Sequence, residues 1–359
     1  MPARKPDGNL KRGWTTGACA TAATAAAYEA LVTGTFPDAV TITLPRGEEP
    51  TFDLARTGLE DGRASAAVIK DAGDDPDVTH GAEVSVSLRE GAAGSGVIFR
   101  AGPGVGTVTL PGLPLAVGEP AINPGPRKMM TGVIEDLSRR LNGPGDVEIT
   151  VAIKDGEVLA EKTMNGRLGI RGGLSVLGTT GIVIPYSCAS WIHSIHRGVD
   201  VARAGGLAHI AAATGSTSEA AVKAMYGLPD MALIDMGDFA GGLLKYLRRH
   251  PVARLTLAGG FGKLAKLAQG NLDLHSARSS LDMNKLAALA ADDADLAKGI
   301  KTANTGMEAL TLAQAAGVAL ADRVAQGARE VALAALAGDV VVEVLVFDRQ
   351  GQLAGRAGG

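Results

Sequence analysis

The sequence of 359 residues contains two cysteines, Cys19 and Cys188, and few aromatic residues: two tryptophans, four tyrosines and six phenylalanines. Two cysteines are too few for a disulfide framework or a cysteine-rich zinc site, so we expect a cytoplasmic protein in a reducing compartment. Large rings are scarce, whereas glycine occurs 49 times. The core must therefore rely on alanine, valine and leucine and on close approach of backbone segments.

An excess of basic charge is also missing. Lysine and arginine number 35 against 38 aspartates and glutamates, which gives a net charge of −3. This balance argues against nucleic acid as a partner, and an anionic ligand must be bound by a local cluster of cations. No window offers about 18 unbroken apolar residues, so we expect no membrane span.

The N-terminal segment has the outline of a secretory signal, because Arg4, Lys5, Lys11 and Arg12 precede the uncharged stretch 13–28, GWTTGACATAATAAAY. The stretch contains no leucine and is followed at once by a glutamate, so we interpret it as a helix of the mature fold. Its first residues would present two hydroxyls and free backbone N–H groups, which could bind a carboxylate or a partner domain. These residues are Thr15, Thr16 and Gly17. Cys19 behind them is interpreted as a packing residue.

Short strand-like stretches occupy residues 40–44, 64–69, 83–88 and 97–99. Alternation of apolar and polar residues in the first and third predicts strands with one solvated face, in an antiparallel or mixed sheet. A helix is expected at 127–141 and a further strand at 146–153. We therefore assign residues 1–160 to an α+β domain whose alanine-rich helix packs on the sheet.

The pattern changes after about residue 165. Residues 207–215, 231–237 and 252–262 each contain a short apolar run, then glycine, and each is followed by a helical pattern. This succession is typical of a parallel sheet buried on both faces. We predict a Rossmann-like domain with a mainly parallel sheet within residues 161–359, completed by helices near 284–298 and 304–326 and a strand at 338–348. The fold class is thus α/β and α+β in two domains.

Four glycine loops are expected at the carboxyl edge of this parallel sheet, where ligands of open α/β sheets bind. None contains GxGxxG or a phosphate-binding GxxxxGK[ST] sequence. One such loop would ordinarily be a tight connection, but four on one edge favour a nucleotide-like ligand. Asp235 could accept hydrogen bonds from ribose hydroxyls, although a helix cap at Asp235 or Asp238 is an open alternative. The residues expected at this ligand are Thr179, Thr180, Gly181, Thr214, Gly215, Ser216, Asp235, Gly237, Asp238, Gly259 and Gly260.

An acidic loop at 72–82, AGDDPDVTHGA, gathers Asp74, Asp75, Asp77 and His80. It lacks the central glycine and closing glutamate of an EF-hand loop, so we predict no metal site there. A role as general base or in substrate binding is open, and so is ordinary turn chemistry.

Isolated histidines and lysines have two interpretations each. His193 and His196 lack a third metal ligand, so we interpret them as flanking a partly buried helix face. Lys263 and Lys266 lie one turn apart and either face an anionic ligand or belong to a solvated helix face. Cys188 has no histidine partner in the sequence, which disfavours a cysteine nucleophile.

Taken together, six motifs resemble those of the CbiD family, the cobalt-precorrin-5B C1-methyltransferases of cobalamin biosynthesis. They occupy residues 11–30, 72–82, 104–127, 173–183, 236–241 and 259–276, in the family's order. The resemblance extends from about Lys11 to Val346.

The resemblance implies methyl transfer from S-adenosylmethionine to C1 of a contracted tetrapyrrole, giving a precorrin-6A. The Rossmann-like domain would bind S-adenosylmethionine and the N-terminal domain would lie on the substrate side. A polar group that adjusts the protons of the macrocycle would be His80 or one of Asp74, Asp75 and Asp77. The residues expected at the substrate, whose carboxylates need cations and donors, are Thr15, Thr16, Gly17, Asn123, Arg127, Lys263 and His275, with Lys128 and Arg12 as further cations.

Two alternatives stay open, a nicotinamide-dependent reductase of a similar macrocycle and a non-catalytic tetrapyrrole carrier. The residues alone indicate no more than a nucleotide-like ligand. They do not decide whether the substrate carries cobalt or whether the chain forms a homodimer.

Overall fold

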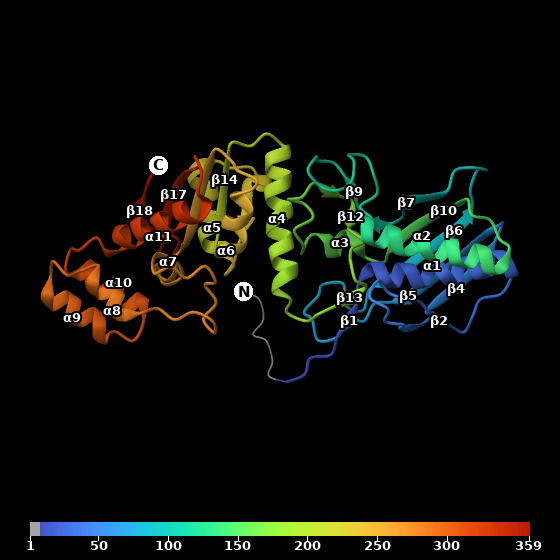
Figure 1. Cartoon of the computed structure of the whole chain (residues 1–359), viewed down its shortest axis with the longest axis horizontal. Coiled ribbons are helices and arrows are strands. Elements are labelled where there is room, and N and C mark those ends of the chain that lie inside the picture. Colours follow the sequence, from blue (N-terminus) through green and yellow to red (C-terminus); the bar gives the residue numbers. More distant parts are fainter. Residues whose placement is uncertain (1–7) are drawn as a thin grey trace. The chain divides into compact units, whose positions relative to one another are not determined.

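The computed structural model describes residues 8–359, which form two compact units, one ending at Ser187 and one spanning Cys188–Gly359 (Figure 1). Arg4 and Lys5, of the basic N-terminal segment, lie outside the described residues. Among residues 8–359, none of the helices has the length and apolar character needed to cross a bilayer.

The boundary between the units lies 27 residues beyond the expected position at 160. Residues 161–187 belong to the N-terminal unit because three two-residue strands tie them to it. These are β11 (Ile170–Arg171), β12 (Gly173–Leu174) and β13 (Ile182–Val183), which pair with β9 (Thr107–Val108), β8 (Gly104–Val105) and β1 (Gly13–Trp14). Such short strands carry no periodic signal in the sequence.

The N-terminal unit contains a mixed five-stranded sheet in the order β4-β5-β6-β10-β7, in which only β7 and β10 are parallel. Along β6 the side chains of Val84, Val86 and Leu88 are buried and those between them are partly exposed, as the alternation predicts. The strands are β4 (Arg56–Glu60), β5 (Arg63–Ile69), β6 (Glu83–Glu90), β7 (Val97–Ala101) and β10 (Val147–Ile153), with a separate pair β2 (Ala39–Thr41) and β3 (Thr51–Asp53).

Helix α1 (Thr16–Thr33) lies against β5 and β6, with α2 (Pro124–Leu141) beside it (Figure 1). Because α1 is rich in alanine, it is buried on nearly every side, and the hydroxyls of Thr21 and Thr24 donate to carbonyls one turn back at 2.8 Å. Helix α2 begins three residues before the expected residue 127, since a proline suits the first turn. The short α3 (Gly156–Ala160) follows β10.

The C-terminal unit contains a five-stranded sheet in the order β15-β14-β16-β17-β18, in which the first four strands are parallel and β18 is antiparallel. Its strands are β14 (His209–Ala213), β15 (Leu233–Asp235), β16 (Arg254–Gly260), β17 (Val341–Phe347) and β18 (Leu353–Ala357). The three expected strand-to-helix units are therefore present.

Helices cover both faces of this sheet. Helix α5 packs on one face, against Ala211, Ala213 and Leu345, and α4, α6, α7 and α11 contribute to the larger core on the other. The helices are α4 (Cys188–Ala204), α5 (Ser216–Tyr226), α6 (Ala240–Leu247), α7 (Phe261–Ala268), α8 (Met283–Ala288), α9 (Ala294–Thr302), α10 (Gly306–Ala315) and α11 (Leu320–Leu336), with a 3-10 turn at Asp230–Ala232. The helix expected at 304–326 is divided because Gly317 adopts φ +70°.

Glu343, in the middle of β17, is fully buried. Its carboxylate accepts hydrogen bonds from Tyr226 at 2.7 Å, Arg254 and Thr256 at 3.0 Å and Arg356 at 2.8 Å. Burial alone would raise the pKa of Glu343, but these hydrogen bonds and the nearby arginine charge lower it below the usual value. The carboxylate thus joins α5, β16, β17 and β18.

Replacing Glu343 by Gln should destabilise the C-terminal unit by roughly 2–4 kcal/mol, because two arginines lose their shared counter-ion. Guanidinium unfolding at pH 7, followed by circular dichroism, measures this change. The exposed Glu330→Gln variant serves as control, and an E343Q midpoint equal to that of the control would contradict the structural role given to Glu343.

Candidate functional site

Three loops meet at the carboxyl edge of the parallel sheet, after β14, β15 and β16. Ala213 of β14 is in register with Asp235 of β15 on one side and Ala258 of β16 on the other. The chain runs from β14 to β15 and then crosses back to β16, so the strand order reverses between β14 and β16. In open α/β sheets the crevice at such a reversal is the usual ligand site.

The loops after β14 and β16 approach each other closely. The Thr214 amide donates to the Ala258 carbonyl at 2.9 Å, and a Cβ on Gly259 would lie 2.8 Å from the Thr214 hydroxyl oxygen. Glycine is therefore required at 259. It is not required by the fold at Gly215 or Gly260, whose φ values of 172° and −70° suit any residue and whose missing Cβ atoms would meet nothing within 4 Å. These two glycines leave open space beside the strand ends.

The loop after β15 is held by Trp191 of α4. The indole N–H donates to the Asp235 carbonyl at 3.1 Å, and the ring lies 3.4 Å from where a Cβ on Gly237 would be. Gly237 adopts φ +52°, which favours glycine. Helix α6 begins after Phe239, which occupies the N-cap position, so the alternative in which Asp235 or Asp238 takes that position is wrong.

Lys263 of α7 bridges two of the three loops. Its Nζ donates to the Thr214 carbonyl at 2.9 Å and lies 3.1 Å from Oδ1 of Asp238. Lys266, one turn along, donates to the Leu274 carbonyl at 3.1 Å. Both lysines therefore bind backbone of their own unit, and neither belongs to a purely solvated helix face.

His275 lies beside the loop after β15. The preceding Leu274 amide donates to the Asp238 carbonyl at 2.8 Å, which fixes the start of this segment, and the His275 side chain is exposed. Nearby, Arg278 donates to Asp273 at 2.8 Å and to the sulfur of Cys188 at 3.0 Å. No pattern in the sequence indicates the contact between Arg278 and Cys188.

Thr179, Thr180 and Gly181 do not belong to the parallel sheet, which corrects the expectation of four loops on one edge. They lie in the N-terminal unit, where the Gly181 carbonyl accepts from the Thr15 amide at 2.9 Å. A Cβ on Gly178 would collide with Thr15. A glycine turn is a local signal that does not reveal which strand it follows, so the sequence pattern places this loop at the wrong sheet.

This loop covers the start of α1. Gly17 donates its amide to the Leu177 carbonyl at 2.9 Å, Thr16 Oγ1 accepts from the Leu177 amide at 3.0 Å, and Thr15 Oγ1 accepts from the Ala18 amide at 3.1 Å. The expectation of free N–H groups is therefore wrong for Thr15 and Gly17, whose amides donate to the Gly181 and Leu177 carbonyls. The first turn of α1 instead forms hydrogen bonds with Leu177, a residue of the same unit.

The start of α2 lies next to the same loop. A Cβ on Gly125 would be 3.2 Å from Cα of Thr179, and Asn123 donates its amide to the Val176 carbonyl at 2.9 Å. The Asn123 side chain makes no capping hydrogen bond, and Thr179 is exposed. Asn123 and Thr179 thus lie together at the N-terminal end of α2.

Arg127 is bound within its own unit. Its guanidinium donates to the carbonyls of Ile122 at 2.7 Å and Pro120 at 3.2 Å, pairs with Glu119 at 2.8 Å and lies over the Phe99 ring. These contacts hold the proline-rich segment before α2. Arg127 therefore offers little unpaired charge to a ligand.

Asp77 is paired with Lys70, for which the sequence alone predicts no role. The ammonium of Lys70, whose side chain is 1% exposed, lies 2.6 Å from Asp77, which also accepts from the amide and hydroxyl of Thr79 at 2.8 and 2.7 Å. Burial would raise the pKa of Asp77, but Lys70 and the hydrogen bonds outweigh it and lower the pKa below its usual value. A lysine directly after a buried strand, seven residues before the aspartate, was the available signal.

The other polar side chains of the acidic loop also accept hydrogen bonds from backbone amides. Asp75 accepts from the Tyr186 amide at 2.8 Å, and Asp74 from the Lys11 amide at 2.5 Å. His80 Nδ1 accepts from the Ala72 amide at 3.1 Å, while its side chain is 55% exposed. With Nδ1 as acceptor, neutral His80 carries its proton on Nε2 and presents a donor.

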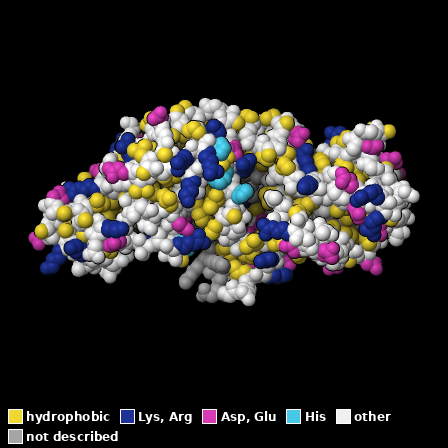
Figure 2. Space-filling model, viewed as in Figure 1, with side chains coloured by type: hydrophobic (Ala, Val, Ile, Leu, Met, Phe, Trp, Pro, Cys, Tyr) yellow, Lys and Arg dark blue, Asp and Glu magenta, His cyan; other side chains and the backbone are white. Residues whose placement is uncertain are grey.

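No group of three or more His, Cys, Asp or Glu within residues 8–359 is arranged to hold a metal ion. His196 instead stacks on Tyr246 at 3.9 Å between ring centroids, and Tyr246 on His250 at 4.1 Å. His193 is exposed and His196 partly buried, as interpreted from the sequence. On the face of the molecule drawn in Figure 2, histidine side chains lie among lysine and arginine side chains.

Cys19 is a packing residue, as the sequence analysis interprets it. It is fully buried, and burial raises the pKa of its thiol to about 12. The thiolate needed for nucleophilic chemistry is therefore strongly disfavoured.

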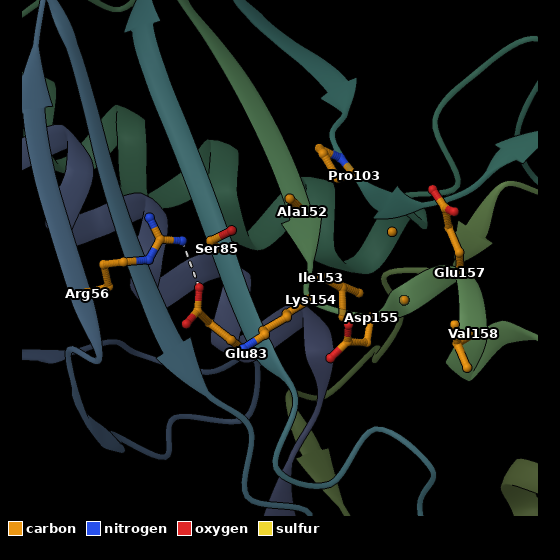
Figure 3. Close-up of a pocket in the computed structure, with 12 residues that line it drawn as sticks. Arg56, Glu83, Ser85, Pro103, Ala152, Ile153, Lys154, Asp155, Glu157 and Val158 are labelled. Atoms are coloured by element: carbon orange, nitrogen blue, oxygen red, sulfur yellow. Dashed lines mark hydrogen bonds and ion pairs between the residues drawn. The ribbon is translucent and has the colours of Figure 1, made fainter.

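A cleft of about 750 Å³ lies in the N-terminal unit, and none of the expected site residues lines it (Figure 3). Arg56 and Glu83 form an ion pair at 2.7 Å on one wall. The other charged residues of the lining are Lys154, Asp155 and Glu157. Acidic groups outnumber basic ones, so the cleft is poorly suited to a polyanion.

The contacts of Asp77 predict a structural effect. Asp77→Asn should lower the free energy of unfolding of the N-terminal unit by roughly 2–4 kcal/mol at pH 7, because it leaves the buried ammonium of Lys70 without its counter-ion. Since the pKa of Asp77 is lowered, its stabilisation is complete above the ordinary aspartate pKa of about 3.9 and is lost as the pH falls further. The difference from wild type should shrink there. Urea unfolding across pH measures it.

The exposed Asp53→Asn variant is the control for this measurement. A D77N protein of unchanged stability would refute the structural assignment of Asp77 and return the residue to the catalytic candidates.

Two family models match parts of this chain. The CbiD family model matches residues 3–185, ending close to the boundary of the N-terminal unit, and the model of the CbiD C-terminal domain matches residues 273–358. A solved structure, the cobalamin biosynthesis protein (cbiD) from Archaeoglobus fulgidus, is 27% identical, covers 76% of this chain and 84% of its own, and gives a TM-score of 0.41.

Several relatives are named cobalt-precorrin-5B C(1)-methyltransferase. The protein from Bradyrhizobium sp. is 59% identical over 97% of this chain and 93% of its own length. The Halorhodospira halophila protein is 59% identical over 97% and 95%, and the Methylorubrum extorquens protein 57% identical over 96% and 97%. With such identity over nearly its whole length, this chain belongs to the CbiD family.

Proposed function

We propose that this chain transfers a methyl group from S-adenosylmethionine to C1 of cobalt-precorrin-5B, giving cobalt-precorrin-6A. The observation that carries the proposal is 59% identity over 97% of the chain to a relative named for this reaction. The partner is thus a small-molecule tetrapyrrole.

We infer further that the C-terminal unit is a Rossmann-like domain that binds S-adenosylmethionine. Four parallel strands with helices on both faces and a reversal of strand order between β14 and β16 support this inference. A nicotinamide dinucleotide is less well supported because the loop after β14, Thr214-Gly215-Ser216, lacks the GxGxxG sequence.

The strand ends fit an adenosine ligand. Gly215 and Gly260 leave space that a Cβ would fill, although neither packing nor backbone conformation requires glycine there. Thr214, Ser216, Gly237 and Gly259 would line the same crevice, and the Asp235 carboxylate would accept from the ribose hydroxyls. When bound, S-adenosylmethionine supplies an activated methyl group.

The chain's own contribution to the reaction is mainly positioning. A sulfonium methyl is already electrophilic, so holding the accepting carbon in line and close accounts for much of the rate. Asp75 and Asp77 hold the acidic loop through their carboxylates. His80, which presents Nε2–H, would donate to a polar atom of the macrocycle rather than act as a base.

Carboxylates of the macrocycle would bind at the start of α2. Asn123 and the exposed Thr179 offer side-chain donors there, and the exposed Lys128 adds charge. The N-terminal end of a helix favours an anion through its backbone dipoles. Thr15, Thr16 and Gly17 would act indirectly, by fixing the loop that carries Thr179.

The reaction itself gives the first test. With methyl-labelled S-adenosylmethionine and cobalt-precorrin-5B, the label should appear in the macrocycle and S-adenosylhomocysteine should form in equal amount. Spectral binding of the macrocycle without label transfer would indicate a carrier. Tight binding of NADPH without binding of S-adenosylhomocysteine would indicate a reductase.

The two open glycines give the second test. Gly215→Thr and Gly260→Thr should weaken S-adenosylhomocysteine binding at least about tenfold, since a branched side chain fills the space beside the ligand. Stability should hardly change, because threonine and glycine are comparable N-cap residues. Calorimetric titration measures the affinity, and thermal unfolding the stability. Gly299→Ala, on α9, is the control, and unchanged affinity in both threonine variants would place the adenosine elsewhere.

A further inference from the structure

Lys263 and Asp238 form a pair of opposite charges at the carboxyl edge of the parallel sheet. Lys263 Nζ lies 3.1 Å from Asp238 Oδ1, and the side chains are 36% and 18% exposed. The lysine comes from α7, after β16, and the aspartate from the loop after β15. The pair thus lies beside the crevice between β14 and β16 and is partly open to a ligand.

Neither charge is fully satisfied by the described residues. An ammonium has three N–H donors, and among the described residues Lys263 donates a hydrogen bond to the Thr214 carbonyl, at 2.9 Å. Donors are therefore left for a ligand, even though the ammonium lies beside Asp238. Asp238 Oδ1 is buried and takes no hydrogen bond from residues 8–359, because its contact with Lys263 is an ion pair of poor hydrogen-bond geometry. A ligand would reach this carboxylate at Oδ2.

We propose that this pair binds the amino acid end of S-adenosylmethionine, with Lys263 donating to its α-carboxylate and Asp238 accepting from its α-ammonium. The inference rests on the proposed function. A zwitterion matches two opposite charges 3.1 Å apart, since each ligand charge meets its opposite. A carboxylate of the macrocycle, the partner expected for Lys263 from the sequence, matches less well because Asp238 would repel it.

Two ligands distinguish the proposed contact with the amino acid end from binding of the adenosine. S-adenosylhomocysteine carries the zwitterion, whereas 5′-methylthioadenosine keeps the adenosine and the sulfur but lacks the amino acid. Calorimetric titration of the full chain should show tighter binding of S-adenosylhomocysteine. In Lys263→Met its affinity should fall about 10- to 100-fold, the range for a lost charge-assisted hydrogen bond, while that of 5′-methylthioadenosine should change less than about twofold.

Three further variants complete the experiment. Asp238→Asn should also weaken S-adenosylhomocysteine selectively, and Lys263→Arg should retain most of the preference. Lys266→Met is the matched control, because it removes a lysine of the same helix that also binds a backbone carbonyl but forms no ion pair with a carboxylate of residues 8–359. Its preference for S-adenosylhomocysteine should equal that of wild type.

The outcomes distinguish this inference from the proposed function. If wild type binds neither nucleoside, the adenosine site itself is wrong. If wild type binds both equally, or if K263M and D238N change both affinities by the same factor or not at all, the adenosine site stands and the zwitterion contact is refuted. If thermal unfolding shows that K263M does not fold, the affinities of K263R and D238N for the two ligands decide whether the zwitterion contact exists.

Discussion

Close approach of backbone segments is the constraint on which both units depend. In the N-terminal unit, Gly13 passes so near Ala72 that a Cβ would collide with its backbone, and Gly178 meets Thr15 in the same way. These contacts bring the acidic loop and the loop at 177–181 to the start of α1. In the C-terminal unit, Gly259 lets the loop after β16 meet Thr214. A chain with few large side chains builds its contacts from small residues, and those contacts set the geometry of the candidate sites.

The elements that the sequence predicts well are those with a periodic pattern. The alternation in 83–88 indicates β6, and the apolar runs ending in glycine indicate β14, β15 and β16. The two-residue strands β11, β12 and β13 have no such pattern, so the boundary between the units is displaced from 160 to 187. For the same reason the sequence pattern places the loop at 178–181 at the parallel sheet, whereas the loop belongs to the N-terminal unit.

The candidate sites are less predictable because a polar residue in the sequence does not reveal its partner. Arg127 and Asp77 have the residue types expected of a ligand site, yet Glu119 and Lys70 already neutralise them. Gly215 and Gly260 show the reverse, since the fold gives no reason for glycine there. Only the structure separates glycines that the backbone needs from glycines that leave space for a ligand.

The distribution of charge suggests how a chain of net charge −3 could handle two different ligands. Beside the strand ends of the C-terminal unit, opposite charges lie together at Lys263 and Asp238, an arrangement that attracts a zwitterion and discourages a polyanion. At the start of α2, Asn123, Thr179 and Lys128 offer donors and positive charge. A macrocycle with several carboxylates is therefore favoured at the start of α2 and disfavoured beside Lys263 and Asp238. Local charge, rather than the charge of the whole chain, would then assign each ligand to its own surface.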